Sequence, residues 1–303
     1  MSLEDKVFFV EETPRSPKEN LAINQHCINL VGNGKYSVIG RAYYHTKGVI
    51  LGHNESLSDV NLENCEALGY EVVRRPTGGS AIVVDPKRVL CYSIFFLPRK
   101  FGLQGDVTDS YKRMAIPLAT KLGKGVSVRG AYYLRADVGV DQVPIAGHAL
   151  KIHSSALGRV VQFDGVVNRT VLDAETISKL LKLRELHTSG GNNYMVVDGM
   201  IYDEKGKITE ATKLVLVRSE REELERSVGL REIGITDKRF LQALHQVMED
   251  NFGEVRTKAL KFGKRAIQKT SAEIERRIGD GKRGLLGHCF VDLLEPEPIL
   301  VYG

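Results

Sequence analysis

Apolar residues recur at helical spacing close to the N-terminus of the chain. The segment begins with Ser16, a residue type that favours the N-cap position, and Pro17, which suits the first turn of a helix. Glu19 stands three residues after Ser16 and completes a capping box. The pattern predicts a helix that ends at Gly32 and buries one apolar face, made of Leu21, Ile28 and Val31.

Short apolar runs predict strands through most of the first 170 residues. They cover Ser37–Ala42, Val49–Leu51, Ala81–Val84, Val89–Leu97, Asp137–Val140, Ile145–Ile152 and Val160–Val167. Helical patterns cover Thr108–Leu122, Ala174–Leu186 and Phe240–Met248. Asp198-Gly199 indicates a hairpin between Tyr194–Val197 and Met200–Tyr202. Because strands and helices do not alternate regularly, we expect the fold class to be α+β.

Composition narrows the class of protein. The 303 residues carry a net charge of +5 and no basic arm interleaved with aromatics, so nucleic acid is not an expected partner. The chain has no apolar run of about 18 residues, and Met1–Lys6 lacks the pattern of a signal peptide, so we expect a cytoplasmic protein without membrane spans. The four cysteines lack the spacing of a zinc or redox site: Cys27, Cys65, Cys91 and Cys289.

The segment Arg74–Asp85, with the sequence RRPTGGSAIVVD, is the most informative stretch. Two consecutive glycines permit positive φ angles and a close approach of the backbone to a ligand. Exposed backbone N–H groups in such a turn bind anions, and the planar fork of Arg75 suits a phosphate or a carboxylate. A Gly-Gly turn alone is more often a plain hairpin than a binding loop, so other segments must decide its role.

This segment resembles the Arg-Arg-x-Thr/Ser-Gly-Gly-Gly loop of the lipoate–protein ligases, which is followed by an apolar run and His-Asp. The matching residues are Arg74, Arg75, Thr77, Gly78, Gly79 and Asp85. Ser80 replaces the third glycine and Val84 replaces the histidine. The resemblance runs over residues 5–190, resumes over Phe240–Ile278 and leaves residues 190–230 as an insertion.

Two further segments carry the resemblance. Asp137–Ala149 is similar to the family motif Asn-Asp-apolar-apolar-apolar-x-Gly-x-Lys-Ile-x-Gly-x-Ala, and it matches at Asp137, Ile145, Gly147 and Ala149. Gln162–Val167 is similar to the His-His-Gly-apolar-apolar segment that flanks the acyl pocket of the family. That likeness assigns two residues to an acyl pocket in this chain, Asp164 and Gly165.

The resemblance implies a mixed, mostly antiparallel sheet with surrounding helices, as in the biotin ligases and the class II aminoacyl-tRNA synthetases. It implies a catalytic domain over residues 1–235, with the insertion at 190–230, and a helical, basic C-terminal segment over residues 236–303. Nine basic residues mark that segment: Lys258, Lys261, Lys264, Arg265, Lys269, Arg276, Arg277, Lys282 and Arg283. They form either a solvated helix face or a docking surface for the carrier domains of this family, which are commonly acidic.

Ligases of this family use ATP and Mg²⁺ to activate lipoate or octanoate as acyl-AMP. They then pass the acyl group to a lysine of a lipoyl carrier domain, which belongs to a 2-oxoacid dehydrogenase or a glycine cleavage protein. For this chain the resemblance implies that Arg75 contacts the acyl phosphate or carboxylate and that Asp137 lies towards metal and nucleotide. It implies a backbone cradle formed by Thr77, Gly78, Gly79 and Ser80.

The chain departs from the family at the lysine beside the anhydride, a position that here holds Pro144. Two residues are candidates to supply the missing positive charge. His148 lies four residues further on and shares the strand face of Pro144. Lys151 lies at an odd offset on the opposite face, unless a bulge near Gly147 returns it to the site. We therefore expect the catalytic group to be Lys151 or His148.

Three alternatives to an ATP-dependent ligase remain open from the sequence. Some family members transfer octanoyl or lipoyl groups without ATP through a cysteine thioester, but no cysteine stands directly before Asp137, and Cys91 lies inside an apolar run. Loss of the lysine at Pro144 and of the histidine at Val84 would also suit a non-catalytic relative that binds an acyl ligand or a carrier. Biotin ligases have a Gly-Arg-Gly-rich loop that differs from Arg75–Ser80.

Overall fold

The computed structural model describes residues 6–53, 55–123, 126–129, 137–140, 143–171, 173–181, 194–196, 200–202, 208–210, 214–216 and 228–279. Side-chain positions are described for residues 6–53, 55–106, 109–123, 145–171, 173–181 and 228–272. The side chains of Asp137 and Pro144, most of the expected insertion at 190–230 and the last part of the basic segment therefore lie outside the described residues.

The main sheet has eight strands in the order β15-β1-β2-β6-β10-β9-β8-β7. Strand β1 runs parallel to both of its neighbours, β15 and β2, and all other neighbouring pairs in this sheet are antiparallel. The predicted mixed, mostly antiparallel sheet is thus confirmed. The strands are β1 (Lys6–Arg15), β2 (Val38–His45), β6 (Val89–Phe96), β7 (Val126–Arg129), β8 (Asp137–Val140), β9 (Val143–Ser155), β10 (Gly158–Asn168) and β15 (Arg256–Thr257).

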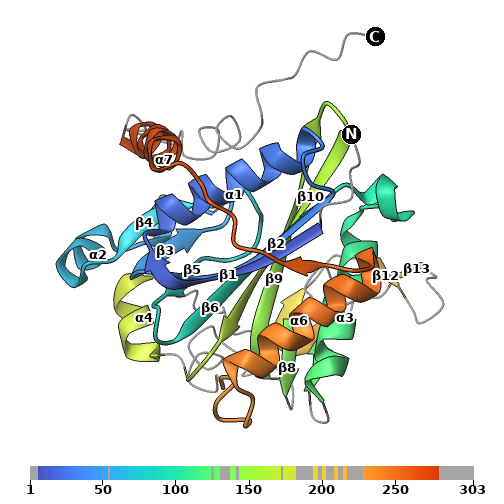
Figure 1. Ribbon diagram of the computed structural model, residues 1–303. Coiled ribbons are helices and arrows are strands. Elements are labelled where there is room, and N and C mark those ends of the chain that lie inside the picture. The colour runs from blue at the N-terminus through green and yellow to red at the C-terminus, as the bar shows by residue number, and fades with distance from the viewer. Residues whose placement is uncertain are drawn as a thin grey trace.

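Helices cover both faces of this sheet (Figure 1). Helices α1 (Pro17–Gly32) and α7 (Lys264–Gly279) lie on one face, and α3 (Val107–Leu122) and α6 (Asp237–Phe252) lie on the other. Each face has its own apolar core, because successive side chains of a strand point in opposite directions. The α1 face buries Ile39, Tyr43 and Phe95, whereas the α6 face buries Val38, Tyr92 and Phe96.

A smaller sheet with the order β4-β3-β5 lies beside the N-terminal end of α1. It consists of β3 (Gly48–Leu51), β4 (Glu71–Arg74) and β5 (Ile82–Val84), and it packs against α2 (Leu62–Leu68) and α4 (Ala174–Leu180). Two short 3₁₀ helices, η1 (Leu57–Asp59) and η2 (Pro98–Phe101), complete the connections. The loop with the two glycines therefore joins two strands of the small sheet and ends beside the large one.

The local sequence signals at α1 are confirmed. The hydroxyl of Ser16 accepts a hydrogen bond from the Glu19 backbone N–H at 3.3 Å, and the Glu19 carboxylate accepts one from the Ser16 N–H at 3.1 Å. Pro17 opens the helix, and Leu21, Ile28 and Val31 are all buried. The capping box thus fixes where α1 begins, and this start aligns its buried face with the main sheet.

Two local predictions are wrong. The helix expected over Ala174–Leu186 ends at Leu180, because Leu181 is extended and forms an isolated bridge with Val60. The hairpin expected at Asp198-Gly199 does not form either. Strand β11 (Tyr194–Val196) pairs with β14 (Leu214–Leu216), and β12 (Met200–Tyr202) pairs with β13 (Ile208–Glu210).

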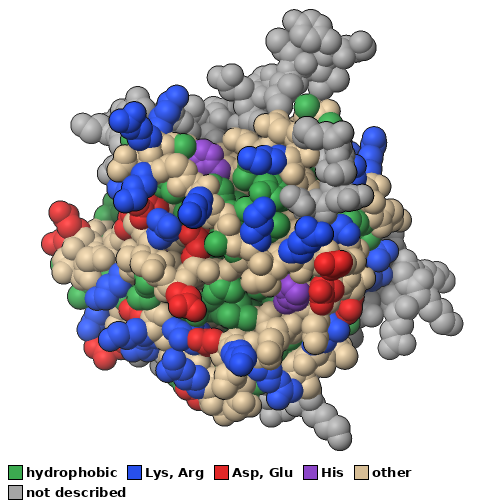
Figure 2. Space-filling view, viewed as in Figure 1, with side chains coloured by type: hydrophobic (Ala, Val, Ile, Leu, Met, Phe, Trp, Pro, Cys, Tyr) green, Lys and Arg blue, Asp and Glu red, His purple; other side chains and the backbone are tan. Residues whose placement is uncertain are grey.

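Helix α7 and the segment before it form a basic surface on the outer side of α1. Ile267 anchors α7 in the core of the α1 face, whereas its cationic neighbours are exposed: Lys258, Lys261, Lys264, Arg265 and Lys269. Figure 2 shows Lys and Arg side chains over this region. Among the residues that the structure describes, no helix has both the length and the apolar character needed to cross a bilayer.

Candidate active site

A cavity of about 420 Å³ lies between α1, the loop after β4 and the strands β2, β6, β9 and β10. Its volume is in the range of small-molecule sites. One side is apolar, with Leu21, Ile50, Ile82 and Val166. The cavity also brings together most of the site residues expected from the sequence: Arg75, Gly78, Gly79, Ser80, Gly147, His148, Ala149, Asp164 and Gly165.

The glycine-rich loop is shaped by a close backbone contact. Gly79 has a φ of +90°, a conformation that favours glycine. A Cβ atom on Gly52, at the end of β3, would overlap the carbonyl oxygen of Gly79, so both glycines are needed for the loop to fold onto this strand. Gly78 differs, because a Cβ atom there would meet no atom within 4 Å. The backbone at Gly78 is therefore open to the cavity.

Arg75 binds its own loop. Its Nε and Nη2 donate to the Gly78 carbonyl at 3.2 and 2.7 Å, and Nη2 also donates to the Ser80 carbonyl at 2.9 Å. Its Nη1 donates to the Ile50 carbonyl at 3.0 Å. Four of the five N–H groups of the guanidinium are thus engaged. Burial lowers the pKa of Arg75, and the charge of Asp164 opposes that shift. The expected contact of Arg75 with an acyl phosphate stays a prediction, because its donors here hold the loop together.

Asp164 links the loop to the sheet. Its Oδ1 accepts a hydrogen bond from the Ser93 hydroxyl at 2.6 Å, and its Oδ2 accepts one from the Gln162 amide at 2.8 Å and one from Thr77 Oγ1 at 3.2 Å. Burial raises the pKa of the Asp164 carboxyl, while these three donors and Arg75 oppose the shift. Thr77 is fully buried and lies behind the cavity wall, so its role in the structure is to anchor the loop.

A buried polar network extends from Asp164 towards β1. Ser93 lies 3.1 Å from the Tyr43 hydroxyl and 3.2 Å from the Asn24 amide, and Asn24 accepts a hydrogen bond from Arg41 at 2.7 Å. Arg41 is fully buried and also pairs with Glu11. The network rigidly positions polar groups on the cavity wall, because each member has a partner.

Sequence reasoning missed Asn24, Tyr43 and Ser93, which line or support the cavity. One signal was present. Asn24 lies between Leu21 and Ile28 on the apolar face of α1, and Ser93 interrupts the apolar run of β6. Polar residues at core positions mark a buried hydrogen-bond network, which often belongs to a functional site.

His148 belongs to an aromatic cluster on the α6 side of the sheet. Its Nε2 is hydrogen-bonded to the Tyr92 hydroxyl, and its ring stacks on Phe163 with the centroids 5.2 Å apart. Burial raises the pKa of Tyr92, so this tyrosine keeps its proton and suits the donor role. A Cβ atom on Gly165 would overlap the Tyr92 ring, which explains the glycine at that position. The imidazole of His148 is thus held against one side of the cavity.

Lys151 lies next to the cavity wall. In the pairing of β8 with β9, Val138 is opposite Ala146 but Gly139 is opposite Pro144, so β9 has one extra residue there. Ile145 and Ala146 are accordingly both buried in the core of the α6 face. This bulge, just before Gly147, places Lys151 an even number of ladder positions from Pro144 and His148 an odd number. The prediction that His148 shares the strand face of Pro144 is therefore wrong, and Lys151 shares it instead.

Beyond the bulge, β9 alternates regularly. Leu150 and Ile152 pack on the α6 side, so Lys151 faces the α1 side together with Ala149. Ala149 is directly opposite Asp164 in β10, and Lys151 is opposite Gln162. The ammonium of Lys151 has no hydrogen-bond or ion-pair partner among the described residues. Its side chain is half-buried.

For Asp137 the structure gives the backbone position only. Its neighbour Val138 is opposite Ala146, so Asp137 approaches the end of the cavity at Gly147. No group of three or more His, Cys, Asp or Glu side chains suited to a metal ion occurs where side chains are described. The expected role of Asp137 towards a metal therefore stays a prediction.

Two motif positions lie away from the cavity. Asp85 is in the turn between β5 and β6, where its Oδ1 accepts a hydrogen bond from the Lys87 N–H at 2.8 Å. Val84, at the position of the family histidine, is buried in the core of the α1 face.

Cys91 lines the cavity, although the apolar run around it predicts only a core position. Its thiol is buried, and burial together with the charge of Asp164 raises the pKa of Cys91 to about 12. A thiol with this pKa is protonated at neutral pH and is a poor nucleophile. Cys27 and Cys65 are likewise free and buried.

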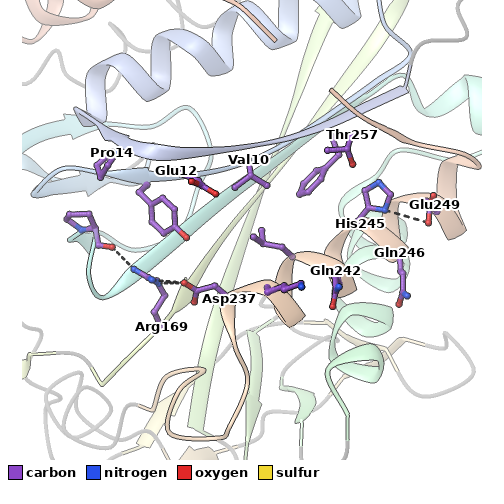
Figure 3. A pocket seen from close by; sticks show the side chains of 15 residues that line it. Val10, Glu12, Pro14, Arg169, Asp237, Gln242, His245, Gln246, Glu249 and Thr257 are labelled. Carbon is purple, nitrogen blue, oxygen red and sulfur yellow. Dashed lines mark hydrogen bonds and ion pairs between the residues drawn. The ribbon is translucent and has the colours of Figure 1, made fainter. Parts of the chain in front are cut away.

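A second, larger cavity of about 1090 Å³ lies on the opposite face of the sheet, between β1 and α6 (Figure 3). Its polar groups largely pair with each other: Arg169 Nε donates to Asp237 at 2.8 Å, and His245 lies 3.6 Å from Glu249. Val10 and Glu12 lie on its rim, at the part of β1 that β15 does not cover. None of the site residues expected from the sequence lines this groove, so the smaller cavity is the candidate active site.

Solved structures similar to this one include lipoate–protein ligases. Lipoate-protein ligase A bound with ATP superposes with a TM-score of 0.62 and 14% sequence identity, covering 94% of this chain and 99% of that one. The bipartite lipoate protein ligase of Thermoplasma acidophilum gives a TM-score of 0.61 at 17% identity, covering 91% of this chain and 94% of that one. At these identities the likeness shows the fold, and the expected α+β class is confirmed.

The chain belongs to the lipoyl protein ligase A/B catalytic domain family, whose model matches residues 16–189. Among curated relatives, the octanoyltransferase LipM of Carboxydothermus hydrogenoformans is 32% identical over 124 residues, which is 40% of this chain and 45% of that protein. The lipoate-protein ligase LplJ of Bacillus subtilis is 25% identical over 172 residues, which is 54% of this chain and 48% of that protein. The chain thus matches less than half the length of these curated relatives.

Proposed function

We propose that this protein is an acyl-activating ligase that joins lipoate or octanoate to a lysine of a lipoyl carrier domain. The observation that carries the proposal is the single cavity in which the glycine-rich loop meets Asp164, Gly165 and Ala149. Its apolar side suits a medium-length acyl chain, and the open backbone at Gly78 suits the close approach of an anion. Membership of the lipoyl protein ligase A/B family supports an acyl-transfer reaction.

ATP and Mg²⁺ are the cofactors implied by this function, and they would supply activation of the acyl carboxylate. The residues present fit an anionic group at one end of the cavity, because Gly78 leaves space beside the backbone and the cation Lys151 stands nearby without a partner among the described residues. Asp137, whose neighbour Val138 is opposite Ala146, approaches the cavity at Gly147 and would face the metal. The carrier domain would present its lysine to the cavity.

We assign the catalytic positive charge to Lys151. The family motif Lys-Ile-x-Gly-x-Ala also fits Lys151-Ile152-His153-Ser154-Ser155-Ala156, where the lysine is present and Ser154 replaces the glycine. On this placement no lysine is missing, and Pro144 is simply an earlier position of β9. The charge of Arg75 is offset by Asp164 and its donors hold the loop, so the anhydride needs another cation. Lys151 would stabilise the charge that develops on the carboxylate and phosphate.

Measurement of acyl-adenylate formation tests this assignment. We expect Lys151→Ala to lower the rate by at least about 100-fold, in line with the loss of one donor to developing charge, without change in the melting temperature. Lys35→Ala, at an exposed lysine after α1, is the matched control and should keep the wild-type rate. An unchanged rate in Lys151→Ala would refute the assignment.

The second candidate is an ATP-independent acyltransferase that works through a thioester on Cys91. The position of Cys91 on the cavity wall and the likeness to octanoyltransferases favour it. The raised pKa of Cys91 argues against it, because the thiolate is the reactive form. Transfer from an octanoylated carrier protein without ATP, abolished by Cys91→Ser, would identify this route. Acyl binding without turnover under either condition would instead identify a non-catalytic relative.

A further inference from the structure

We propose that Asp164 is the base that takes a proton from the acceptor lysine as that lysine enters the cavity. The inference rests on the proposed function. The lysine arrives as an ammonium ion, which cannot attack a carbonyl. Asp164 accepts one proton from it and leaves a neutral amine. The C–N bond then forms, the bond between the acyl carbon and its leaving group breaks, and the leaving oxygen takes the second proton.

The first argument is the charge of the cavity. Among the described residues that line it, Asp164 is the one carboxylate. An acyl carboxylate and a phosphate are both anions, so a negative charge on the wall works against their binding. The same negative charge favours the binding of a cation. The cationic substrate of the proposed reaction is the acceptor lysine, so the carboxylate matches the second half of the reaction and not the first.

The second argument is the geometry of the carboxylate. A carboxylate offers about four lone-pair sites. Gln162 and Thr77 occupy two of them on Oδ2, and Ser93 occupies one on Oδ1. One site on Oδ1 remains, and Asp164 is partly exposed on the cavity wall. The three protein donors fix the orientation of the group and leave one position for a donor from a substrate.

The third argument is the lack of a better base among the described residues that line the cavity. His45 lines the cavity, but burial and the charge of Arg41 lower its pKa to about 3, and its Nδ1 contacts Asn20 at 3.1 Å. His148 is occupied by Tyr92. Burial raises the pKa of the Asp164 carboxyl above that of an ordinary aspartate, as a base that works near neutral pH requires.

The groups that face Asp164 set the pH dependence of this step. The positive charge of Arg75, in the glycine-rich loop, favours the charged form of Asp164 and so lowers the pKa of its carboxyl. Tyr43 of β2 and the β6 residues Cys91 and Tyr92 feel the charge of Asp164, and their own pKa values are raised, so they remain neutral. Lys151 of β9 is opposite Gln162, two ladder positions from Asp164 and on the same face of the sheet. The carboxylate therefore has the fixed cation Arg75 as a neighbour, and Lys151 on the adjacent strand.

The test compares two acceptors in a single turnover from preformed octanoyl-adenylate. The first acceptor is a lipoyl carrier domain, whose lysine must lose a proton. The second is hydroxylamine, which is uncharged at neutral pH and needs no base to become a nucleophile. We expect Asp164→Asn to slow transfer to the carrier by at least about 100-fold and to leave transfer to hydroxylamine within about threefold of wild type. Asp59→Asn, outside the cavity in η1, is the matched control for both acceptors.

A second variant reports on the base without removing it. Ser93→Ala deletes a donor to the carboxylate, so the pKa of Asp164 should rise and the acidic limb of the carrier-transfer profile should move up by about one pH unit. Equal losses with both acceptors in Asp164→Asn would mean that Asp164 only anchors the loop, and an unchanged rate with the carrier would also overturn the inference. If the wild-type protein transfers nothing to either acceptor, the proposed function fails and this inference falls with it.

Discussion

At the scale of single residues, the glycines at the loop have two different roles: Gly52 and Gly79 allow the loop to fold, whereas Gly78 leaves space for a ligand. Gly52 and Gly79 are required for the loop to fold, because a side chain on either would be blocked or strained. Gly78 has space for a side chain and an ordinary φ, so the fold gives no reason for a glycine there. The remaining reason is a ligand that approaches the backbone at this point.

The variant Gly78→Ala tests whether a ligand approaches the backbone at Gly78. The added methyl group fits the empty protein, so we expect a melting temperature close to that of the wild type. It would occupy the space of the ligand, so we expect the dissociation constant for lipoate to rise by at least about tenfold, or about 1.4 kcal/mol. Gly263→Ala is the matched control, because a Cβ atom there also meets nothing within 4 Å. Equal lipoate affinity in both variants, measured by calorimetry, would place the ligand elsewhere.

His45 makes a second prediction at this scale. Its pKa falls from 6.5 to about 3, chiefly through burial, so the folded protein keeps it neutral while the unfolded chain binds a proton below pH 6.5. The unfolded state therefore binds more protons between these values, and the free energy of unfolding should fall as the pH falls, by about 1.4 kcal/mol per unit. We expect His45→Gln to flatten this slope in urea titrations at several pH values. An identical slope in both proteins would contradict the assignment.

At the scale of elements, the start of α1 fixes the apolar side of the cavity. The capping box places Leu21 and Asn24 on the inner face of the helix, where both line the cavity. We expect Ser16→Ala to lower the free energy of unfolding by about 1 kcal/mol and to weaken lipoate binding as the first turn frays. Ser56→Ala, at the N-cap of the exposed η1, is the control and should change neither quantity measurably. A loss no larger than that of the control would mean that packing alone positions α1.

Elements with strong local signals could be predicted from the sequence. The cap of α1, the apolar runs of β2, β6 and β10, and the amphipathic pattern of α6 all report local chemistry, and each was located within a few residues. The end of α4 at Leu180 and the pairing of β11 with β14 depend on partners distant in the chain, such as Val60 for Leu181, so local patterns did not reveal them.

The sequence also predicted only part of the candidate site: it located the residues of the motifs but not the geometry that depends on strand pairing. Gly78, Gly147 and Asp164 come from three separate motifs and all line one cavity, as their match to the family motifs predicted. The bulge at Ile145–Ala146 shifts which residues of β9 share a face, and only the pairing with β8 reveals it. The hydrogen bonds of Arg75 to its own loop could not be predicted from the sequence either, because an arginine in such a motif is equally compatible with a contact to the ligand.

At the scale of the whole molecule, the helix α7 that carries the basic surface and the candidate site share one apolar core. Ile267 of α7 packs in the same core as Leu21 and Ile50, which line the cavity. This arrangement suits the docking role that the sequence left open beside a solvated face.

Charge reversal distinguishes these two roles. We expect the triple variant Lys264→Glu, Arg265→Glu and Lys269→Glu to raise the KM for the carrier by about tenfold and to reduce the salt dependence of that KM. Acyl-adenylate formation should not change, because the cavity is intact. The control reverses three exposed lysines that lie away from α7, Lys35, Lys87 and Lys100, and so matches the change in net charge. Equal KM values in the two triple variants would make the basic surface a solvated face.

The measurement that tests the central claim most directly is the intact mass of a lipoyl carrier domain after incubation with the protein, lipoate, ATP and Mg²⁺. The proposed function requires a mass increase of one lipoyl group that depends on ATP and is lost in Lys151→Ala. An unmodified carrier despite measurable binding of lipoate, or acylation that needs only an octanoylated donor protein and no ATP, would contradict it.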